Sequence, residues 1–338
     1  MKLKIGLIGT NFISSDFCEA AVLVPETELY AVYSRKQETG DRFAQKHGIR
    51  RVYTDYDAFL DSGLDAVYVA SPNFVHCEQT LKALKHGKHV LCEKVMAVNE
   101  TEVQAMIDCA RERGLILLEA MRPDFDPAYD LIGQTLPRLG PLSRATFEFC
   151  QYSSRYDRFL GGEPVNAFNP ELCNAAVMDI GVYCIHSLVR LFGMPDQIRA
   201  CSVKLPNGFE GSGTVLLRYH SMVAEAIYSK TAVSVTPSII QGEKGSLLID
   251  YVSRPETLEL RLRKGSRDTL AGGDIRALSF TPAKNNMVYE IREFVRLIKN
   301  KEVNHKYLQY SLNTIRIIDE VRRQNGIVFP GCSFFNNV

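Results

Sequence analysis

The stretch IGLIGTNFIS, residues 5–14, joins an apolar run to a segment with helical spacing through a glycine turn. The dinucleotide-binding fingerprint Gly-x-Gly-x-x-Gly/Ala has this position, after a strand and before a helix. Only its first glycine is kept, as Gly9, while Asn11 and Ser14 stand at the other two positions. We expect Asn11 to adopt a left-handed backbone and Ser14 to let helix and strand approach closely. The helix N-terminus would then offer N–H groups to a pyrophosphate.

The first 120 residues place this turn in an alternating pattern. Segments with helical spacing separate apolar runs at 3–8, 29–33, 65–70, 90–93 and 115–120, with a weaker strand at 51–53. Continuous apolar strands that alternate with helices predict a parallel sheet covered on both faces, a doubly wound Rossmann-type fold. On the motif alone, a plain strand–turn–helix explains residues 5–14 equally well. The first strand of such a sheet, however, is where dinucleotides bind.

The regular alternation of apolar strands and helices ends after Pro123. One helix is expected at 176–191, and two more close the chain near 288–300 and 308–325. The expected strands between them lie at 215–219, 223–228, 246–251 and 258–263. Several of these strands alternate apolar with polar residues, which is typical of an antiparallel sheet with one solvated face. We therefore predict an α/β chain with a dinucleotide-binding domain at 1–121 and an α+β substrate-binding and oligomerisation domain at 122–338.

The composition excludes several classes of protein. The 338 residues carry a formal net charge of +1, which gives no support for nucleic-acid binding. The nine cysteines are odd in number and contain no Cys-x-x-Cys pair, so reduced core cysteines are expected rather than disulfides or a zinc site. The sequence shows no secretory signal and no apolar stretch of the ~18 residues that a membrane span needs. We expect a cytoplasmic protein with no membrane partner.

The end of the second strand bears on the choice of cofactor. It reads Tyr33-Ser34-Arg35-Lys36, and no acid follows before Glu38. An NAD-binding domain usually carries an acid here for the ribose 2′-OH, whereas a 2′-phosphate favours a hydroxyl and a cation. The arginine offers a planar fork suited to phosphate. This pattern favours NADP, with NAD possible, although Arg35 and Lys36 would also suit a solvated helix start.

The segment HVLCEKVMA, residues 89–97, places a charged pair between apolar residues. Lys94 follows a parallel strand at the sheet edge where ligands bind. A partly dry crevice and a nearby nicotinamide cation would lower the pKa of its ammonium, which suits proton exchange near neutral pH. Glu93 would hydrogen-bond the nicotinamide ribose or orient the lysine. The plain alternative for Lys94 is a surface lysine on a loop.

A second group of polar residues lies in AAVMDIGVYCIHSLVRLFG, residues 175–193. Asp179, Tyr183 and His186 are spaced i, i+4 and i+7, which places them on one face of a helix. Three polar groups along an apolar helix indicate a site. The alternative is a capping Asp, a half-buried Tyr and a satisfied core His, and for His186 alone this alternative is preferred. No metal site is expected.

Taken together, these residues resemble the glucose–fructose oxidoreductase and inositol dehydrogenase family (Gfo/Idh/MocA), in particular its dihydrodiol and xylose dehydrogenase-like members. The resemblance runs over the whole chain. It rests on IGLIGTNFI, VASPNFVH (69–76), HVLCEK, EAM (119–121), NPEL (169–172) with MDIGVYCIH (178–186), GEKGSLLI (242–249) and GIVFP (326–330).

The resemblance implies roles for particular residues. Lys94 matches the family lysine that contacts substrate and nicotinamide, and Asp179 and Tyr183 match its acid and its acid/base group. The residues matched to the cofactor site are Gly9, Thr10, Asn11, Phe12, Ile13, Ser34, Arg35, Ser71, Pro72, Asn73, His76, Glu93 and Lys94. The resemblance also implies an open sheet that makes a homodimer or tetramer contact.

Three departures from the family pattern bear on the substrate. Val95 replaces the usual proline after the lysine, and Asp124 stands where an arginine is common. Cys173-Asn174-Ala175 replaces a glycine-rich run, which would reshape the pocket.

The hypothesis that follows is an NADP-dependent oxidoreductase acting on a hydroxyl or carbonyl of a small sugar, polyol or dihydrodiol. Two alternatives stay open: a dinucleotide-binding regulator or scaffold without turnover, and a glycosidase that uses bound NAD. The Ser34-Arg35 pair disfavours the glycosidase.

Overall fold

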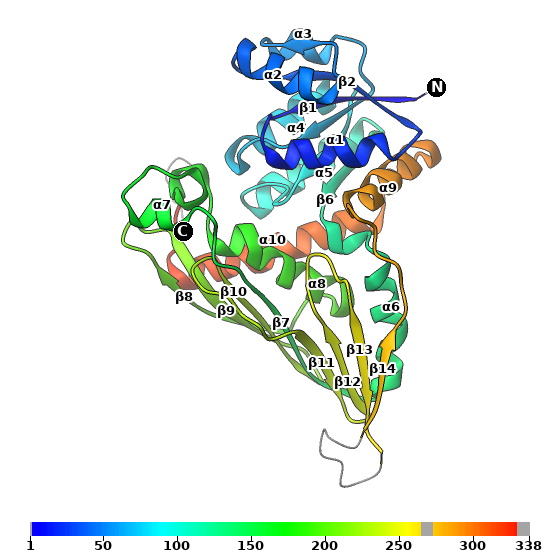
Figure 1. Cartoon of the computed structure of the whole chain (residues 1–338), viewed down its shortest axis with the longest axis vertical. Helices are drawn as coiled ribbons and strands as arrows, with labels where there is room; N and C mark the ends of the chain where they lie inside the picture. The colour runs from blue at the N-terminus through cyan, green and yellow to red at the C-terminus, as the bar shows by residue number, and fades with distance from the viewer. Residues whose placement is uncertain (1, 265–272, 330–338) are drawn as a thin grey trace. The chain divides into compact units, whose positions relative to one another are not determined.

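The computed structural model describes residues 2–264 and 273–329 (Figure 1). The chain divides into two compact units. Unit 1 consists of Met1–Phe125 with Ala283–Leu312, and unit 2 of Asp126–Pro282 with Asn313–Val338. The proline of the GIVFP segment, Pro330, and the last cysteine, Cys332, lie outside the described residues. The functional division at residue 121 stays a prediction.

Unit 1 is built on a parallel sheet of six strands in the order β3-β2-β1-β4-β5-β6. The strands are β1 Leu3–Ile8, β2 Thr27–Tyr33, β3 Val52–Tyr53, β4 Ala66–Val69, β5 His89–Glu93 and β6 Leu117–Ala120. Ile8 is in register with Tyr33 on one side and with Val69 on the other, so three strands end together. This order confirms the predicted doubly wound fold, and its switch point lies between β1 and β4.

The helices of unit 1 cover both faces of this sheet. They are α1 Phe12–Val22, α2 Gln37–His47, α3 Tyr56–Leu60, α4 His76–Lys85, α5 Glu100–Glu112 and α9 Met287–Asn300. Side-chain caps begin several of them: the side chain of Asn99, for example, accepts from Glu102 N at α5. Gly48 ends α2 with φ 69°, a left-handed conformation that glycine adopts readily.

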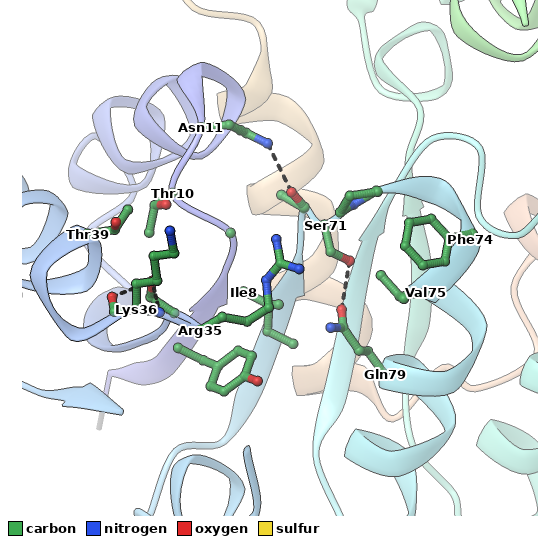
Figure 2. A pocket seen from close by; sticks show the side chains of 15 residues that line it. Ile8, Thr10, Asn11, Arg35, Lys36, Thr39, Ser71, Phe74, Val75 and Gln79 are labelled. Atoms are coloured by element: carbon green, nitrogen blue, oxygen red, sulfur yellow. Dashed lines mark hydrogen bonds between the residues drawn. The ribbon is translucent and has the colours of Figure 1, made fainter. Parts of the chain in front are cut away.

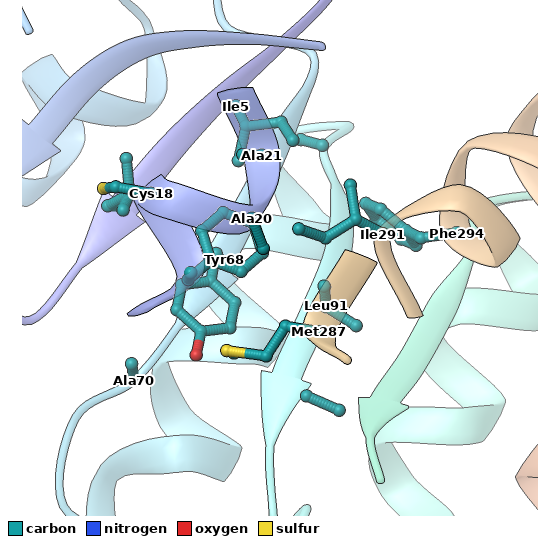
Figure 3. Packing of buried hydrophobic residues seen from close by; sticks show 14 of the residues in the cluster. Ile5, Cys18, Ala20, Ala21, Tyr68, Ala70, Leu91, Met287, Ile291 and Phe294 are labelled. Carbon is teal, nitrogen blue, oxygen red and sulfur yellow. The ribbon is translucent and has the colours of Figure 1, made fainter. Parts of the chain in front are cut away.

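Helix α9 comes from a segment far along the chain. Its Met287, Ile291 and Phe294 are buried in one apolar cluster with Tyr68 of β4 (Figure 3). Phe17 of α1 belongs to the same cluster. The rings of Phe17 and Tyr68 stack with their centroids 3.8 Å apart. The core of unit 1 is therefore completed by a helix that starts 167 positions after the last strand of its sheet, at Met287 against Ala120.

Unit 2 contains an eight-stranded sheet in the order β14-β13-β12-β11-β7-β10-β9-β8. Its strands are β7 Leu142–Cys150, β8 Gln197–Lys204, β9 Glu210–Arg218, β10 Val223–Ser229, β11 Ser238–Gly242, β12 Gly245–Ile249, β13 Leu258–Leu262 and β14 Asp274–Leu278. Among these described strands, only β7 and β10 pair in parallel. The predicted mostly antiparallel sheet is confirmed.

The helices of unit 2 begin with α6 Pro127–Thr135 and α7 Tyr156–Leu160. The expected helix at 176–191 is present, but it starts with a π-helical turn, η6 Val177–Gly181, before α8 Val182–Phe192. Helix α8 packs against β7 and β10. Helix α10 Lys306–Asn325 continues from unit 1 into unit 2.

One long apolar segment of unit 2 meets the length and composition of a membrane span. Pro170–Phe192 has a mean hydropathy of 1.5 over an 18-residue window. However, 78% of that window is buried inside the protein, as is usual for the core helix of a folded domain.

Candidate functional site

Gly9 lies at the turn between β1 and α1 with φ 104°, a region that other residues rarely adopt. A Cβ atom at this position would lie 2.5 Å from the carbonyl oxygen of Ala70, at the end of β4, and 3.5 Å from Ser14 Oγ. Ser14 is fully buried beneath the turn. The first glycine of the fingerprint is therefore required by both backbone and space, and the small Ser14 takes the place predicted for it.

The backbone expected for Asn11 was wrong. Its φ of −89° and ψ of −174° are extended, not left-handed. Its side chain instead caps α1: Oδ1 accepts from Ser14 N at 3.1 Å, and Nδ2 donates to the carbonyl oxygen of Ala70 at 3.1 Å. The side-chain cap satisfies one N–H at the helix start and ties the turn to β4.

A cavity of about 380 Å³ opens beside this turn within unit 1 (Figure 2). Seven of the predicted cofactor residues line it: Gly9, Thr10, Asn11, Ser34, Arg35, Ser71 and Pro72. The other predicted cofactor residues, which are Phe12, Ile13, Asn73, His76, Glu93 and Lys94, do not line it. The cavity lies at the carboxyl ends of β1, β2 and β4, where dinucleotides bind in open α/β sheets.

The end of β2 gives this cavity its charge. Arg35 and Lys36 line it together with Thr39, and Figure 2 shows Thr10, Lys36 and Thr39 on one side and Ser71 and Gln79 on the other. None of the described residues that line the cavity is acidic. Such a lining suits a phosphate group better than a ribose diol that needs an acid.

The hydroxyl of Ser34 is turned toward its own chain. It donates to the carbonyl oxygen of Lys36 at 2.9 Å, and Lys36 N lies 3.4 Å from it. This bond shapes the turn that presents Arg35 and Lys36. Thr39, Phe74, Val75 and Gln79 also line the cavity and were not named as site residues from the sequence. Phe74 and Val75 fall within VASPNFVH, whereas Thr39 and Gln79 lie outside the quoted motifs.

His76 is buried and connects two loops of unit 1. Its Nδ1 lies 2.9 Å from the carbonyl oxygen of Val95, and its Nε2 lies 2.8 Å from that of Ser71. Burial lowers the pKa of His76, while the two carbonyl groups raise it. The ring therefore holds the Ser71 loop against the segment after Lys94 rather than facing the cavity.

Glu93 belongs to a buried group at the end of β5. Its Oε1 accepts from the hydroxyl of Tyr68 at 2.6 Å. Burial raises the pKa of Glu93, and it raises the pKa of the buried Glu290 of α9 well above its usual value. The charge of Arg122 lowers the pKa of both carboxyl groups.

Lys94 is half-buried directly after this group. The four residues that follow it, Val95–Val98, are all buried, and Met96 N donates to Glu119 Oε1 at 2.8 Å. The Lys94–Val95 peptide bond is cis. Asp124, one of the departures from the family pattern, is buried and does not line the cavity.

The second predicted group of residues lies in unit 2, on η6 and α8. Asp179 and Tyr183 are partly exposed, and the Tyr183 ring lies 5.7 Å from that of Phe149. His186 is fully buried, with Nδ1 3.0 Å from Thr314 Oγ1 of α10. His186 is therefore a core histidine, as the sequence favoured, with Nδ1 hydrogen-bonded and Nε2 buried.

Two residues of unit 2 that contact Asp179 or its helical turn were not identified as site residues from the sequence. Lys230 donates to Asp179 Oδ2 at 2.7 Å, and Glu210 accepts from Val177 N at 2.8 Å at the start of η6. Glu210 also accepts from the Tyr228 hydroxyl at 2.8 Å. Glu210 begins β9, 33 positions beyond Val177, and Lys230 follows β10, 51 positions beyond Asp179, so no local spacing could reveal them. Among the described residues, no group of three or more His, Cys, Asp or Glu side chains is placed to hold a metal ion.

Comparison with known proteins decides the family. The model of the Gfo/Idh/MocA oxidoreductase family, with an NAD-binding Rossmann fold, matches residues 3–121. Over 331 residues the chain is 43% identical to scyllo-inositol 2-dehydrogenase (NADP(+)) IolU of Bacillus subtilis (strain 168), covering 97% of this chain and 98% of that protein. The chain belongs to the Gfo/Idh/MocA family.

Two other proteins match over nearly the whole chain. Trans-1,2-dihydrobenzene-1,2-diol dehydrogenase of Macaca fuscata fuscata is 29% identical over 349 residues, covering 98% of this chain and 99% of that one. Levoglucosan dehydrogenase, solved with NADH and levoglucosan, has the same fold with a TM-score of 0.84 at 18% identity, covering 96% and 98%. The predicted oxidoreductase with a nicotinamide-binding Rossmann domain is confirmed.

Proposed function

We propose that this Gfo/Idh/MocA protein is an NADP-dependent dehydrogenase or reductase that acts on a CH–OH group or its carbonyl in a small cyclic polyol, sugar or dihydrodiol. The observation that carries the proposal is the cofactor cavity, which Arg35 and Lys36 line and which has no acid among its described lining residues. The NADP(+)-dependent scyllo-inositol 2-dehydrogenase, at 43% identity, supports both the cofactor and the substrate class.

The residues of the cavity fit such a cofactor. Gly9 leaves space where a Cβ would meet the carbonyl oxygen of Ala70, and the start of α1 would offer N–H groups to a pyrophosphate. The cations of Arg35 and Lys36 would hold a 2′-phosphate. When bound, the nicotinamide supplies the donor or acceptor of a hydride.

We assign the remaining steps to three side chains, as the family resemblance implies. The Lys94 ammonium would stabilise negative charge that develops on the substrate oxygen. Tyr183 would take or give the hydroxyl proton, and Asp179 would orient the substrate hydroxyl. These roles belong to the proposal, as do Glu93 at the ribose and the loop of Ser71, Pro72, Asn73 and His76 beside the cofactor.

A cofactor titration tests the proposal first. The chain has no tryptophan, so NADPH and NADH binding is followed by nicotinamide fluorescence excited directly. We expect NADPH to bind at least 10-fold more tightly than NADH. A preference for NADH would contradict the assignment of Arg35 and Lys36, and binding of neither would contradict the proposed function.

A turnover screen tests the substrate class. The panel contains scyllo-inositol, other cyclic polyols, aldoses and trans-1,2-dihydrobenzene-1,2-diol, each with NADP⁺. Lys94→Ala should lower kcat by about 100-fold or more for any active substrate while NADPH binding stays within a few-fold. Lys85→Ala, on the exposed end of α4, is the matched control. Unchanged turnover in Lys94→Ala would remove its assigned role.

We also propose a cytoplasmic homo-oligomer, a dimer or tetramer. The outer face of the unit 2 sheet carries partly exposed apolar side chains on neighbouring strands, including Leu216 of β9 and Val223 of β10, exposed by 43% and 44%. Exposed apolar patches of this kind often mark contact surfaces between proteins.

A further inference from the structure

Lys230 stands just beyond the end of β10 and is almost sealed from solvent. Its side chain is 5% exposed, and its ammonium donates to Asp179 Oδ2 at 2.7 Å and to the carbonyl oxygen of Ala167 at 2.8 Å. The rings of Phe168 and Phe209 lie 4.9 and 5.3 Å from the same ammonium. A lysine is kept in such a place only when it is paired and hydrogen-bonded.

The partner of this lysine is more open than the lysine itself. The Asp179 side chain is 36% exposed, so the ion pair has one buried side and one side that a ligand can approach. A cation at hydrogen-bonding distance favours the charged carboxylate over the protonated acid. Asp179 is thereby suited to accept a hydrogen bond from a hydroxyl and is not suited to deliver a proton.

The backbone that carries Asp179 is fixed separately. Glu210 accepts from Val177 N at the start of η6, and it is bound in turn by the Tyr228 hydroxyl. Gly181 and Gly213 leave room for the Tyr228 ring, because a Cβ at either would lie within 3 Å of it. Since Glu210 already anchors the π-helical turn, the contact made by Lys230 is directed at the Asp179 side chain.

We propose that Lys230 is a positioning residue that holds the Asp179 carboxylate charged and oriented as the hydrogen-bond acceptor for a hydroxyl of the substrate. This inference rests on the proposed function. It deepens that function by adding Lys230 as the residue that keeps Asp179 in its hydrogen-bond-accepting role, while the proton transfer stays with Tyr183. It also specifies the substrate, because the group next to Asp179 must be a neutral hydroxyl donor and not a carboxylate or phosphate.

The test compares four forms of the full-length protein: wild type, Lys230→Met, Asp179→Asn and the double variant. With the best substrate of the screen, each single variant should lower kcat/KM by 10-fold or more, with NADPH affinity within 2-fold of wild type. Because Lys230 acts only through Asp179, the double variant should be no worse than the poorer single variant. Lys230→Arg, which keeps the charge, should recover most of the lost kcat/KM.

The control is Lys204→Met. Lys204 also donates to a backbone carbonyl within unit 2, that of Gly326, but it is exposed. It should leave kcat and KM within 2-fold of wild type. Losses that multiply in the double variant, or a Lys230→Met enzyme with unchanged kcat and KM, would overturn the inference.

A stability cycle separates this inference from the proposed function. If wild type turns over no substrate in the screen, the proposed function fails. The interaction between Lys230 and Asp179 is then tested by measuring the denaturant unfolding of the same four proteins. The coupling between positions 179 and 230 should then change the unfolding equilibrium constant by 10-fold or more. Additive effects of the two substitutions would overturn the pairing itself.

Discussion

Arg35 is the residue on which cofactor selectivity depends most directly. It lines the cavity at the end of β2, in the position where an acid would select NAD. Its guanidinium can bind two phosphate oxygens at once, and Lys36 adds a second charge. A ribose without the phosphate offers these cations no anionic partner.

We therefore expect Arg35→Gln to weaken NADPH binding by about 10- to 100-fold, as loss of a charge-assisted pair implies, while NADH binding changes less than 2-fold. Fluorescence titration with each cofactor measures both constants. Arg42→Gln, an exposed arginine of α2 outside the cavity, is the control and should change neither. Equal losses for the two cofactors would show that Arg35 serves the fold rather than the phosphate.

Gly9 gives a second prediction at this scale. Gly9→Ala brings a methyl group to 2.5 Å from a carbonyl oxygen in a backbone conformation that L-residues avoid. We expect a stability loss above the ~1–2 kcal/mol of the backbone strain alone, and at least 10-fold weaker NADPH binding. Thermal unfolding and the fluorescence titration measure the two effects.

Gly48→Ala is the control that introduces backbone strain without a steric clash. Gly48 also has a positive φ, 69°, but a Cβ there would meet no atom within 4 Å. This variant should lose about 1 kcal/mol of stability and bind NADPH normally. If it weakens NADPH as much as Gly9→Ala does, the crowding argument at Gly9 is wrong.

The helix formed by η6 and α8 is the element that positions the unit 2 residues, and Glu210 is its anchor on the sheet. Burial raises the pKa of Glu210 to about 7 from a usual 4.5. Between these values the folded protein binds more protons than the unfolded chain, so the free energy of unfolding falls as the pH rises through this window. Over the whole window, the free energy of unfolding falls by about 3 kcal/mol at most because of Glu210.

Glu210→Gln should remove this pH dependence. Urea unfolding of variant and wild type at pH 5 and pH 8 gives their stability difference at each pH, and the difference should move by roughly 2–3 kcal/mol in favour of the variant at pH 8. Glu171→Gln, at an exposed glutamate of the same unit, should show no such change. A constant difference for Glu210→Gln would mean that the carboxyl group keeps its ordinary pKa in the fold.

Secondary structure was predictable where buried residues recur at regular intervals along the sequence. The continuous apolar strands of unit 1 and helix α9 were found within a few residues. Strands β7, β8, β11 and β14 were not. The edge strands β8 and β14 and the short β11 carry few buried apolar residues, and the central strand β7 carries polar residues such as Arg144 and Glu148 that resemble loop sequence. The π-helical turn at Val177–Gly181 was also missed, since a helical spacing assumes 3.6 residues per turn.

For the candidate site, residues in local motifs were predictable, and residues brought together from distant segments were not. Gly9, Thr10, Arg35 and Ser71 were named from local motifs and do line one cavity. Lys230 and Glu210 act on Asp179 and its turn across the sheet, and a sequence gives no register between strands so far apart. The side chain of Asn11 caps α1 in place of the expected left-handed turn, because an Asn before a helix can satisfy a free N–H directly.

At the scale of the whole molecule, the open face of the unit 2 sheet predicts association. We expect the wild type, of 38.0 kDa per chain, to elute as a dimer or tetramer in size-exclusion chromatography with light scattering. Val223→Glu, at the start of β10 on that face, should reduce the molar mass toward one chain. Val235→Glu, at a 96% exposed valine in the loop before β11, should not. A monomeric wild type would contradict the proposed oligomer.

The return of α9 to unit 1 has a consequence for how the chain matures on the ribosome. Met287, Ile291 and Phe294 cover apolar residues of α1 and β4 that are made more than 200 positions earlier. A nascent chain that has emerged only to Phe125 holds a complete parallel sheet whose apolar flank has no cover. That flank must stay exposed through the translation of the whole second sheet, which is the period when such a surface aggregates or recruits a chaperone.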